Sequence, residues 1–502
     1  MKEAIKFTGI ALLILAVITC TFIWPLPGII LLVTCLIILG FYNIFQKKHT
    51  ILRNFPVVGN IRYLLEMIGP EIHQYFIESD TDGKPFNRNQ RSYVYQRAKK
   101  QNQTHPFGTE LDVYGDEYRW MQHSIYPAKK LDSPPRVKIG GPDCGRHYHA
   151  SIFNISAMSF GALSKNAITA LNLGAKAGNF FHDTGEGGIS TYHRQGGDLV
   201  WEIGTGYFGC RTTEGNFDPE KFREKARWPE VRMIEIKISQ GAKPGHGGVL
   251  PASKNNEEIA EIRGVKPHTV VLSPPGHSAF SDAEGLLHFV RELRHLSEGK
   301  PVGFKLAIGS KSEFTAICQK MVETGIKPDF ITLDGAEGGT GAAPIDFSNY
   351  VGMPWESALI FVVDTLRGFG LQKDIRVITA TKIISAFDIF KALAIGADVC
   401  NSARGMMMAL GCIQALKCNT NECPTGVASN DPRYVRGLAV SEKWERVKNY
   451  QENVVEEFTE LLAAAGCHSP EELHRGHIYL KKENDWLTYE EVYPSVAEGA
   501  YL

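Results

Sequence analysis

The chain has 502 residues and a formal net charge of −1, so it is long enough for more than one domain, and its charge gives no general attraction for nucleic acid. Ten cysteines are too few for a disulfide scaffold, and their clustering late in the chain fits metal-cluster ligation in a reducing compartment. The 49 glycines gather in phrases such as GEGG, GHGG and GGTG, which indicates close approach of the backbone to a ligand.

The first apolar segment runs from Phe7 to Phe45 without a charged residue or a histidine. Residues 25–28 divide it into halves of about 18 residues, the shortest length that crosses a bilayer. Because lysines flank both outer ends, we predict a transmembrane helical hairpin over residues 1–46, with both ends in the cytoplasm. A cleaved signal peptide and a buried hairpin in a soluble protein are the alternatives, but no small-residue cleavage site precedes the second half.

Residues 47–146 are polar, rich in aromatic side chains and without a clean period. We interpret them as an irregular N-terminal segment that packs on the following domain, because their aromatic content argues against disorder. Residues 433–502 are charged and are predicted to form a helical tail outside that domain.

Between residues 147 and 432, short apolar runs alternate with amphipathic helical stretches. Eight βα units in series predict an α/β fold, a (β/α)8 TIM barrel with functional phrases just after the strands. A doubly wound sheet is the alternative, but no GxGxxG follows the first strand. The expected strands are 152–158, 179–185, 233–239, 269–274, 302–308, 329–335, 375–381 and 397–403.

Several strand ends carry charged residues that are candidate ligand contacts. Glu186 lies among glycines and could hold an amino or imino group, or simply cap its loop. Lys243 could anchor a carboxylate and Arg263 could add a bidentate anchor, although a loop lysine and a surface helix arginine are the ordinary alternatives. Lys305 lies inside an apolar strand, where it is costly unless paired. It could stabilise negative charge on a reduced flavin or form a structural ion pair.

Small residues at other strand ends would let the backbone approach a bound cofactor closely. The phrase at 155–164 lets backbone amides approach a planar ring, although a tight turn would have the same composition. The phrases at 337–344, 379–382 and 401–405 are predicted to cradle a ring or a phosphate, since the last two loops of a barrel usually bind phosphate. The candidate cofactor-binding residues are Ser156, Met158, Ser159, Gly338, Gly339, Lys382, Ser402 and Arg404.

Cys412, Cys418 and Cys423 form a C-x5-C-x4-C pattern after the last expected strand. Three closely spaced thiolates are the soft ligands that an iron–sulfur cluster needs. The alternative is that they are buried small apolar residues. A phosphate-binding turn beside such a cluster predicts electron transfer between a flavin and a metal centre.

These phrases together resemble the FMN-binding synthase domain of glutamate synthases over about residues 127–431. The motifs ISAMSFGALS, QGAKPGxGGxLP, SPPGH, FKL, GGTGAAP and ALGC-x5-C-x4-CPTG occur in family order. The resemblance implies FMN, a [3Fe-4S] cluster on the three cysteines, and reduction of 2-iminoglutarate, formed from 2-oxoglutarate and ammonia, to L-glutamate. It implies that 2-oxoglutarate is bound by Glu186, Lys243 and Arg263 and that FMN is contacted by Lys305, Gly339, Lys382 and Arg404.

Four positions depart from the family pattern. Val249 stands where the family has glutamine and His246 replaces an acidic residue, which predicts that another acid could fit the substrate pocket. Thr381 and Ala386 stand where the family usually has glycines, and a side chain there predicts crowding of the FMN phosphate.

The resemblance includes neither an amidotransferase domain with its N-terminal cysteine nor a dinucleotide-binding domain. We therefore expect ammonia to be free or to come from a partner, and electrons to come from ferredoxin or a partner reductase. The expected protein is a membrane-anchored, cytoplasm-facing oxidoreductase acting on CH–NH2 donors. The alternatives are an enzyme with the same cofactors that acts on another 2-oxo, 2-amino or 2-hydroxy acid, and a membrane electron-transfer subunit.

Overall fold

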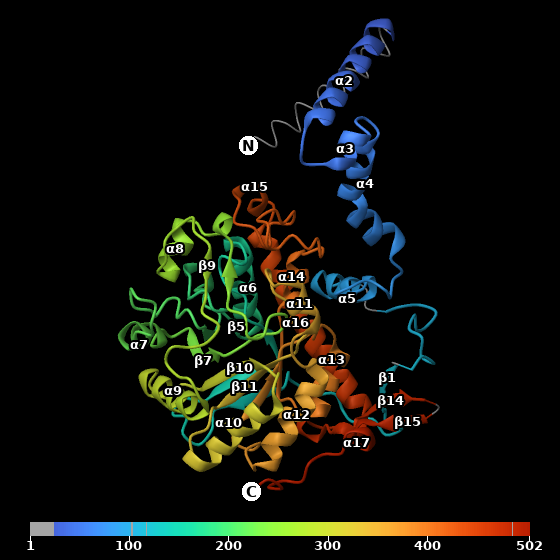
Figure 1. Ribbon diagram of the computed structural model, residues 1–502. Coiled ribbons are helices and arrows are strands. Elements are labelled where there is room, and N and C mark those ends of the chain that lie inside the picture. Colours follow the sequence, from blue (N-terminus) through green and yellow to red (C-terminus); the bar gives the residue numbers. More distant parts are fainter. Residues whose placement is uncertain (1–24, 102–103, 117, 484) are drawn as a thin grey trace. The chain divides into compact units, whose positions relative to one another are not determined.

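The computed structural model describes residues 25–101, 104–116, 118–483 and 485–502 (Figure 1). The chain divides into two compact units, Met1–Asn89 and Gln90–Leu502. The first half of the predicted hairpin, residues 7–24, lies outside the described residues.

The first unit contains an apolar helix followed by shorter ones. Helix α2 (Pro25–Phe45) begins at a proline, whose fixed φ and missing N–H suit a first helical turn. Its segment Leu26–Phe45 has a mean hydropathy of 2.4 and is only 17% buried, so it is long and apolar enough to cross a membrane. The helices that follow are α3 (Thr50–Asn54), α4 (Gly59–Ile72) and the π-helix η1 (His73–Ile77).

Eight parallel strands close into a barrel in the second unit, which confirms the predicted (β/α)8 fold (Figure 1). In chain order they are β4 (Phe153–Ile155), β5 (His182–Asp183), β6 (Leu199–Ile203), β7 (Val231–Lys237), β10 (Val302–Ala307), β11 (Phe330–Asp334), β12 (Arg376–Thr379) and β13 (Val399–Ser402). The helices between them are α6 (Lys165–Gly178), α7 (Pro219–Ala226), α8 (Glu257–Arg263), α9 (Ala283–Leu296), α10 (Lys311–Thr324), α11 (Ile345–Tyr350), α12 (Trp355–Gly368) and α13 (Ala386–Ile395), with α14 (Arg404–Leu410) after the last strand.

Two details of the strand assignment were wrong. The run at 269–274 is rich in β-branched residues, but its strand β9 (Val271–Leu272) pairs antiparallel with β8 (Val249–Leu250) and is not part of the barrel. The third barrel strand is β6, which the sequence reading missed because Glu202 interrupts its apolar run. The prediction omitted one barrel strand, β6, and counted one strand outside the barrel, β9. The strands from β10 onward are therefore still the fifth to eighth of the barrel, as predicted.

The flanking segments are partly regular. The hairpin of β2 (Arg136–Ile139) and β3 (Tyr148–Ser151) packs its Ile139, Tyr148 and Ala150 in one buried cluster with Phe181, Val200, Met233, Phe330, Ile378 and Val399 of the barrel region. Helix α5 (Arg88–Ala98) and strand β1 (Arg119–Met121) precede this hairpin.

The predicted helical tail is helical only in part. It contains α15 (Pro432–Val435), the long α16 (Val440–Ala464) and α17 (Tyr489–Val492), and α16 packs mainly against α6. Between them, β14 (Ile478–Lys482) pairs with both β1 and β15 (Asp485–Thr488) in a three-stranded sheet. The two strands are fixed by pairing with each other and, for β14, with β1, which lies far away in the sequence.

Candidate active site

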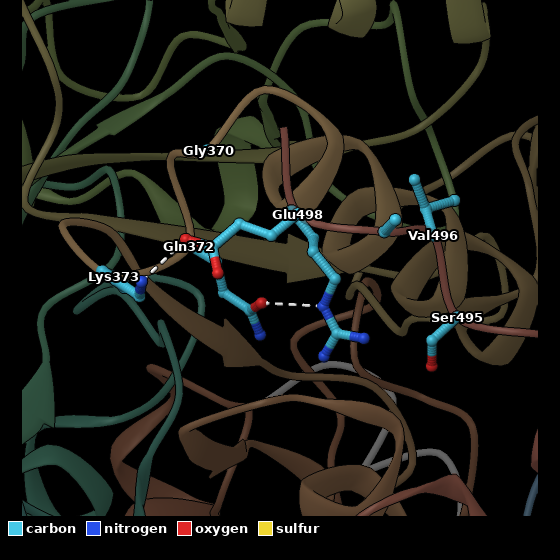
Figure 2. A pocket seen from close by; sticks show the side chains of 8 residues that line it. Gly370, Gln372, Lys373, Ser495, Val496 and Glu498 are labelled. Atoms are coloured by element: carbon cyan, nitrogen blue, oxygen red, sulfur yellow. Dashed lines mark hydrogen bonds and ion pairs between the residues drawn. The ribbon is translucent and has the colours of Figure 1, made fainter. Parts of the chain in front are cut away.

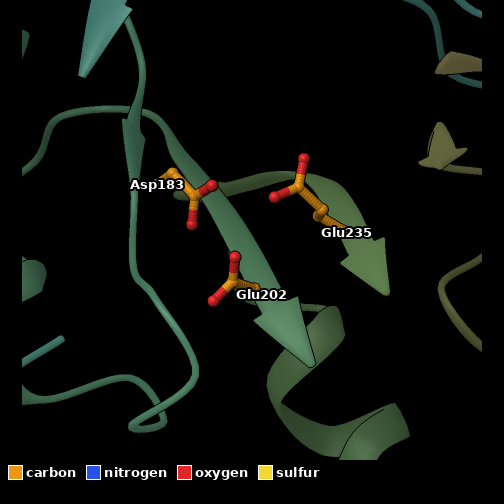
Figure 3. A group of neighbouring side chains, drawn as sticks. All are labelled: Asp183, Glu202 and Glu235. Carbon is orange, nitrogen blue, oxygen red and sulfur yellow. The ribbon is translucent and has the colours of Figure 1, made fainter. Parts of the chain in front are cut away.

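A group of buried ionisable side chains comes together from four strands of the barrel. Asp183, Glu202 and Glu235 come from the neighbouring strands β5, β6 and β7, and their carboxylate oxygens lie within 4.8 Å of one another (Figure 3). The Lys305 ammonium on β10 lies 3.1 Å from Glu202, and the Thr332 hydroxyl donates a hydrogen bond to Glu235. Lys305 therefore supplies the positive charge that such buried carboxylates need.

Burial controls the charge state of this group. Burial and repulsion from the neighbouring carboxylates raise the pKa of Asp183 well above its usual range. Burial is also the main reason that the pKa of Glu235 rises to about 7. Burial alone would favour a neutral Lys305 amine, but Glu202 and Glu235 outweigh it and raise the Lys305 pKa. The ion-pair alternative for Lys305 is thus present in the structure, and its role toward a flavin stays a prediction.

A second group lies around Glu186. The Lys237 ammonium at the end of β7 is 3.0 Å from the Glu186 carboxylate. Burial disfavours the Glu186 carboxylate, yet Lys237, Lys243 and Arg263 outweigh it and lower the Glu186 pKa. The structure thus brings the three predicted substrate residues together and adds Lys237.

This Glu186 group holds three cations and one carboxylate, so it favours an anionic ligand. Burial, followed by repulsion from Lys237, lowers the pKa of Lys243 to about 8, and burial lowers that of Arg263 to about 10. Lys243 donates to the Ala342 carbonyl at 3.2 Å. Arg263 donates to the Phe160 carbonyl at 3.2 Å, and its buried Nε has no hydrogen-bond partner in the part of the chain that the structure describes.

A glycine makes room for the Glu186 carboxylate. A Cβ at Gly248 would lie 2.3 Å from Glu186 Oε1. A side chain there would therefore displace the carboxylate, which explains the GHGG phrase in physical terms.

The predicted phosphate-binding residues come together from several strand ends. A Cβ at Gly339 would lie 3.0 Å from the Arg404 side chain, and Arg404 donates to the Glu337 carbonyl at 3.0 Å. Lys382 has a φ of 55°, and the Ser402 hydroxyl donates to the Ile383 carbonyl at 2.6 Å.

The other predicted cofactor residues lie at the ends of the first and sixth strands. The Ser156 amide donates to the Ser402 carbonyl at 3.2 Å and the Met158 amide to the Asp183 carbonyl at 3.4 Å, which ties the loop after β4 to the ends of β13 and β5. The Ser159 hydroxyl accepts from Arg263 at 3.4 Å, and the Gly338 amide donates to the Gly335 carbonyl at 2.9 Å.

Two polar side chains at the ends of the adjacent strands β12 and β13, Thr379 and Asn401, have unsatisfied hydrogen-bonding atoms. Among the described residues, Thr379 Oγ1 and Asn401 Oδ1 are buried without a hydrogen-bond partner. An orphaned buried polar atom costs about 1–3 kcal/mol, so these atoms fit a site that is completed by a polar ligand.

Thr381 lies where the sequence suggested crowding, but its side chain is engaged elsewhere. It is 1% exposed, and its hydroxyl donates to Asp334 Oδ1 at 2.6 Å and accepts from the Gly335 amide at 2.6 Å. Ala386 is the first residue of α13, which Ser385 caps. Thr381 therefore links the loop after β12 to the end of β11.

The other two departures lie in the loop after β7. Val249 pairs with Leu272 in the β8–β9 ladder, and the His246 ring packs edge-on against Phe347 at 5.4 Å between centroids. His246 Nδ1 also lies 2.9 Å from the Gly247 carbonyl. Both residues help to hold the loop that carries Lys243.

The three late cysteines interact with one another. Burial, together with the charges of Cys418 and Cys423, raises the pKa of Cys412 to about 12. Burial acts on Cys423 in the same sense, but the Thr425 hydroxyl and nearby backbone amides outweigh it and lower the Cys423 pKa. Donors directed at a sulfur atom stabilise a thiolate, so this donor set fits a metal cluster.

Lys254 joins this cysteine segment to the first barrel loop. Its ammonium is buried and donates to the Cys418 carbonyl at 3.1 Å and to the Ala162 carbonyl at 2.6 Å. Burial lowers the Lys254 pKa to about 8. The cysteine segment is thus held against a loop that also carries candidate cofactor residues.

The sequence reading missed four charged residues of the site: Asp183, Glu202, Glu235 and Lys237. All four interrupt or end apolar runs, which is the signal that identified Lys305. The run EIKIS contains two of them.

A separate cleft of about 490 Å³ lies beyond the end of α12 (Figure 2). Lys373 and Glu498 form an ion pair of 2.7 Å there, and Arg367 donates to Gln372 at 3.1 Å. Residues 370–373 precede β12, so the cleft is at the opposite end of the strand from the site, and it contains none of the predicted site residues.

The chain is similar to several known proteins. The conserved region in glutamate synthase matches residues 145–468. The chain is 36% identical over 481 residues to the glutamate synthase large subunit-like protein YerD of Bacillus subtilis (strain 168), covering 88% of this chain and 91% of that protein. It is 35% identical over 387 residues to the archaeal glutamate synthase (NADPH) of Methanocaldococcus jannaschii, covering 76% and 68%. Among solved structures, a mandelate oxidase variant with an FMN adduct is 14% identical with a TM-score of 0.43, covering 84% of this chain and 99% of that one.

Proposed function

The chain belongs to the glutamate synthase family of oxidoreductases, and on that premise we propose that it reduces 2-iminoglutarate, formed from 2-oxoglutarate and ammonia, to L-glutamate. The observation that carries this proposal is the group of Lys237, Lys243 and Arg263 around Glu186. Three buried cations facing one carboxylate suit a ligand with two carboxylates and a basic nitrogen.

Each residue of this group has a distinct part in binding. Lys243 and Arg263 bind the carboxylates of the substrate, and Arg263 has a buried Nε available for a further hydrogen bond among the described residues. Glu186 is held ionised by Lys237 and accepts a hydrogen bond from the imino or amino nitrogen. Catalysis then depends on how firmly these side chains orient the imine carbon.

FMN is the proposed cofactor, and when bound it supplies reducing electrons to the substrate. Arg404 and Lys382 would hold its phosphate. Gly339 has no side chain beside Arg404, so a bound group can contact its backbone there. The unsatisfied Thr379 and Asn401 oxygens support a polar ligand at the same strand ends. Ser156, Met158, Ser159, Gly338 and Ser402 form the surrounding backbone.

An iron–sulfur cluster of the [3Fe-4S] type is the proposed second centre, with Cys412, Cys418 and Cys423 as ligands. Its support is the spacing of the three cysteines in one segment and the hydrogen bonds at the Cys412 and Cys423 sulfur atoms. When bound, it supplies electrons from an external donor, which we propose is ferredoxin or a partner reductase. Ammonia comes from solution or from a partner.

We also propose that the protein is anchored in the cell membrane with the barrel in the cytoplasm. The support is α2, which is apolar and mostly exposed over a length that spans a bilayer.

Anaerobically purified enzyme tests the activity directly. With 2-oxoglutarate, ammonia and a chemically reduced ferredoxin, L-glutamate should form, and a panel of other 2-oxo acids should react more slowly. If another acid reacts while 2-oxoglutarate stays inert, the glutamate assignment is wrong. If no acid reacts unless a second subunit is added, the electron-transfer alternative replaces it.

A further inference from the structure

A continuous helical segment with one apolar side follows α2. Helix α4 and the π-helix η1 extend from Gly59 to Ile77. Seven large apolar side chains lie on one face of this segment, because each of the first five is followed by another three or four residues further along. This apolar face consists of Ile61, Leu64, Leu65, Ile68, Ile72, Tyr75 and Phe76, and each side chain is between 37% and 85% exposed.

The other side of the segment carries the charged and polar side chains, together with the exposed Met67 and Ile77. Arg62 and Glu66 form an ion pair of 2.8 Å one helical turn apart, and both side chains are more than half exposed. His73 lies on the same side, and its Nδ1 is 3.2 Å from the Glu78 carboxylate. A helix with this division is typical of a segment that lies in a membrane interface.

Hydrogen bonds fix where α4 begins relative to α2. The buried Asn43 amide donates to the Pro56 carbonyl at 2.6 Å, and Arg53 donates to the Ile44 carbonyl at 3.3 Å. A Cβ at Gly40 would lie 3.6 Å from the Val57 side chain. The chain therefore folds back onto the last turns of α2, and α4 starts level with the end of the proposed span.

We propose that α4 and η1 lie in the headgroup–acyl boundary of the bilayer that α2 crosses, with the apolar face in the acyl region. The occupant of this face is thus a lipid surface. The cations Lys47, Lys48 and Arg53 lie between the two helices, where they face lipid phosphates and favour an anionic leaflet. This inference rests on the proposed membrane anchorage and adds a second, surface-lying contact.

Photo-crosslinking of the full chain in vesicles of phosphatidylcholine and phosphatidylglycerol tests the contact. A benzoylphenylalanine replaces Ile68 on the apolar face in one variant and Glu66 on the polar side in the matched control. Both sites are exposed, so neither change threatens the fold, and unchanged far-UV circular dichroism checks this. After irradiation, mass spectrometry should find several-fold more lipid adduct at position 68 than at position 66.

Other crosslinks would overturn the inference. An adduct at position 68 with a second protein chain would make the face a protein interface, and one with residues 1–24 or 90–502 of the same chain would make it an internal contact. Equal lipid adducts at both positions would exclude an oriented helix. Anchorage is read separately: if alkaline carbonate removes the protein from the vesicles, the membrane location itself fails, whereas retention without an adduct at 68 refutes only the surface-lying helix.

Discussion

The Lys305 ammonium lies 3.1 Å from the Glu202 carboxylate inside the barrel, and their side chains are only 4% and 2% exposed. With Asp183 and Glu235 in the same group, this lysine offsets part of the repulsion among three buried carboxyl groups. Removing one partner of a buried ion pair leaves an uncompensated charge.

We expect Lys305→Met to lower the free energy of unfolding by about 3–5 kcal/mol. Combining it with Glu202→Gln should recover part of the loss, because the second change removes the stranded charge. Urea unfolding in detergent at pH 7 measures both. Lys320→Met, at an exposed lysine of α10, is the control and should leave the curve unchanged. If Lys305→Met alone unfolds with the free energy of the unaltered protein, the Lys305–Glu202 pairing is contradicted.

Thr381 should support FMN binding instead of opposing it. Thr381→Val removes both hydrogen bonds of the hydroxyl and frees Asp334 and the Gly335 amide, at a cost of about 1–3 kcal/mol. We expect weaker binding in a flavin titration, whereas Thr381→Ser keeps the hydroxyl and should bind normally. The crowding hypothesis makes the opposite prediction, that Thr381→Gly binds FMN more tightly.

Binding of 2-oxoglutarate should weaken as pH rises through about 8. The Lys243 ammonium, whose pKa burial lowers to about 8, is charged below that pH and neutral above it. KM should therefore increase above pH 8 with a smaller change in kcat. Lys243→Met should raise KM by about tenfold or more at pH 7, and Lys243→Arg should remove the pH dependence. A KM that is flat to pH 10 in the unaltered enzyme would rule out this role.

Cys418→Ser should remove the iron–sulfur centre alone. The broad absorption shoulder and the acid-labile sulfide should disappear while the flavin bands remain, because Cys418 is not among the proposed flavin contacts, most of which come from other strand ends. Cys467→Ala, at a buried cysteine beside His477, is the matched control and should retain both. Iron content that does not change in Cys418→Ser would contradict the assignment of the ligand.

Two buried histidines should make the protein sensitive to mild acid. His182 and His193 are fully buried with ring centroids 5.3 Å apart. Burial lowers the pKa of His182 well below its usual range and that of His193 to about 4. Below pH ~6.5 these two histidines bind protons in the unfolded chain but stay neutral in the folded chain. The free energy of unfolding therefore decreases as pH falls.

The melting temperature should therefore be nearly constant from pH 8 to 7 and fall between about pH 6.5 and 4. His182→Leu should flatten this decline. His288→Gln, at an exposed histidine of α9, should leave it as it is. An unaltered slope in His182→Leu would assign the acid sensitivity to other groups.

Local pattern was enough to predict the barrel and to choose the segments of the candidate site. It failed at β6, where Glu202 breaks the apolar run, and at β9, where β-branched residues form a hairpin outside the barrel. In both places the deciding factor was the long-range pairing of strands, which composition does not encode.

The partnerships within the site depended on the same long-range geometry. Lys237 meets Glu186 because β7 lies two strands from β5 around the barrel, and Lys305 of β10 meets Glu202 of β6 in the same way. The sequence identified Lys305 as needing a partner, yet only the closed sheet could show which carboxylate provides it.

On the ribosome, β1 emerges before the first barrel strand and its partner β14 after the last one. β1 therefore lacks its partner β14 until the whole barrel has been translated. An unpaired strand edge is a template for aggregation. Nascent chains arrested just after α16 would contain all eight barrel strands while β1 still lacks β14, so they should aggregate more readily than the full-length chain.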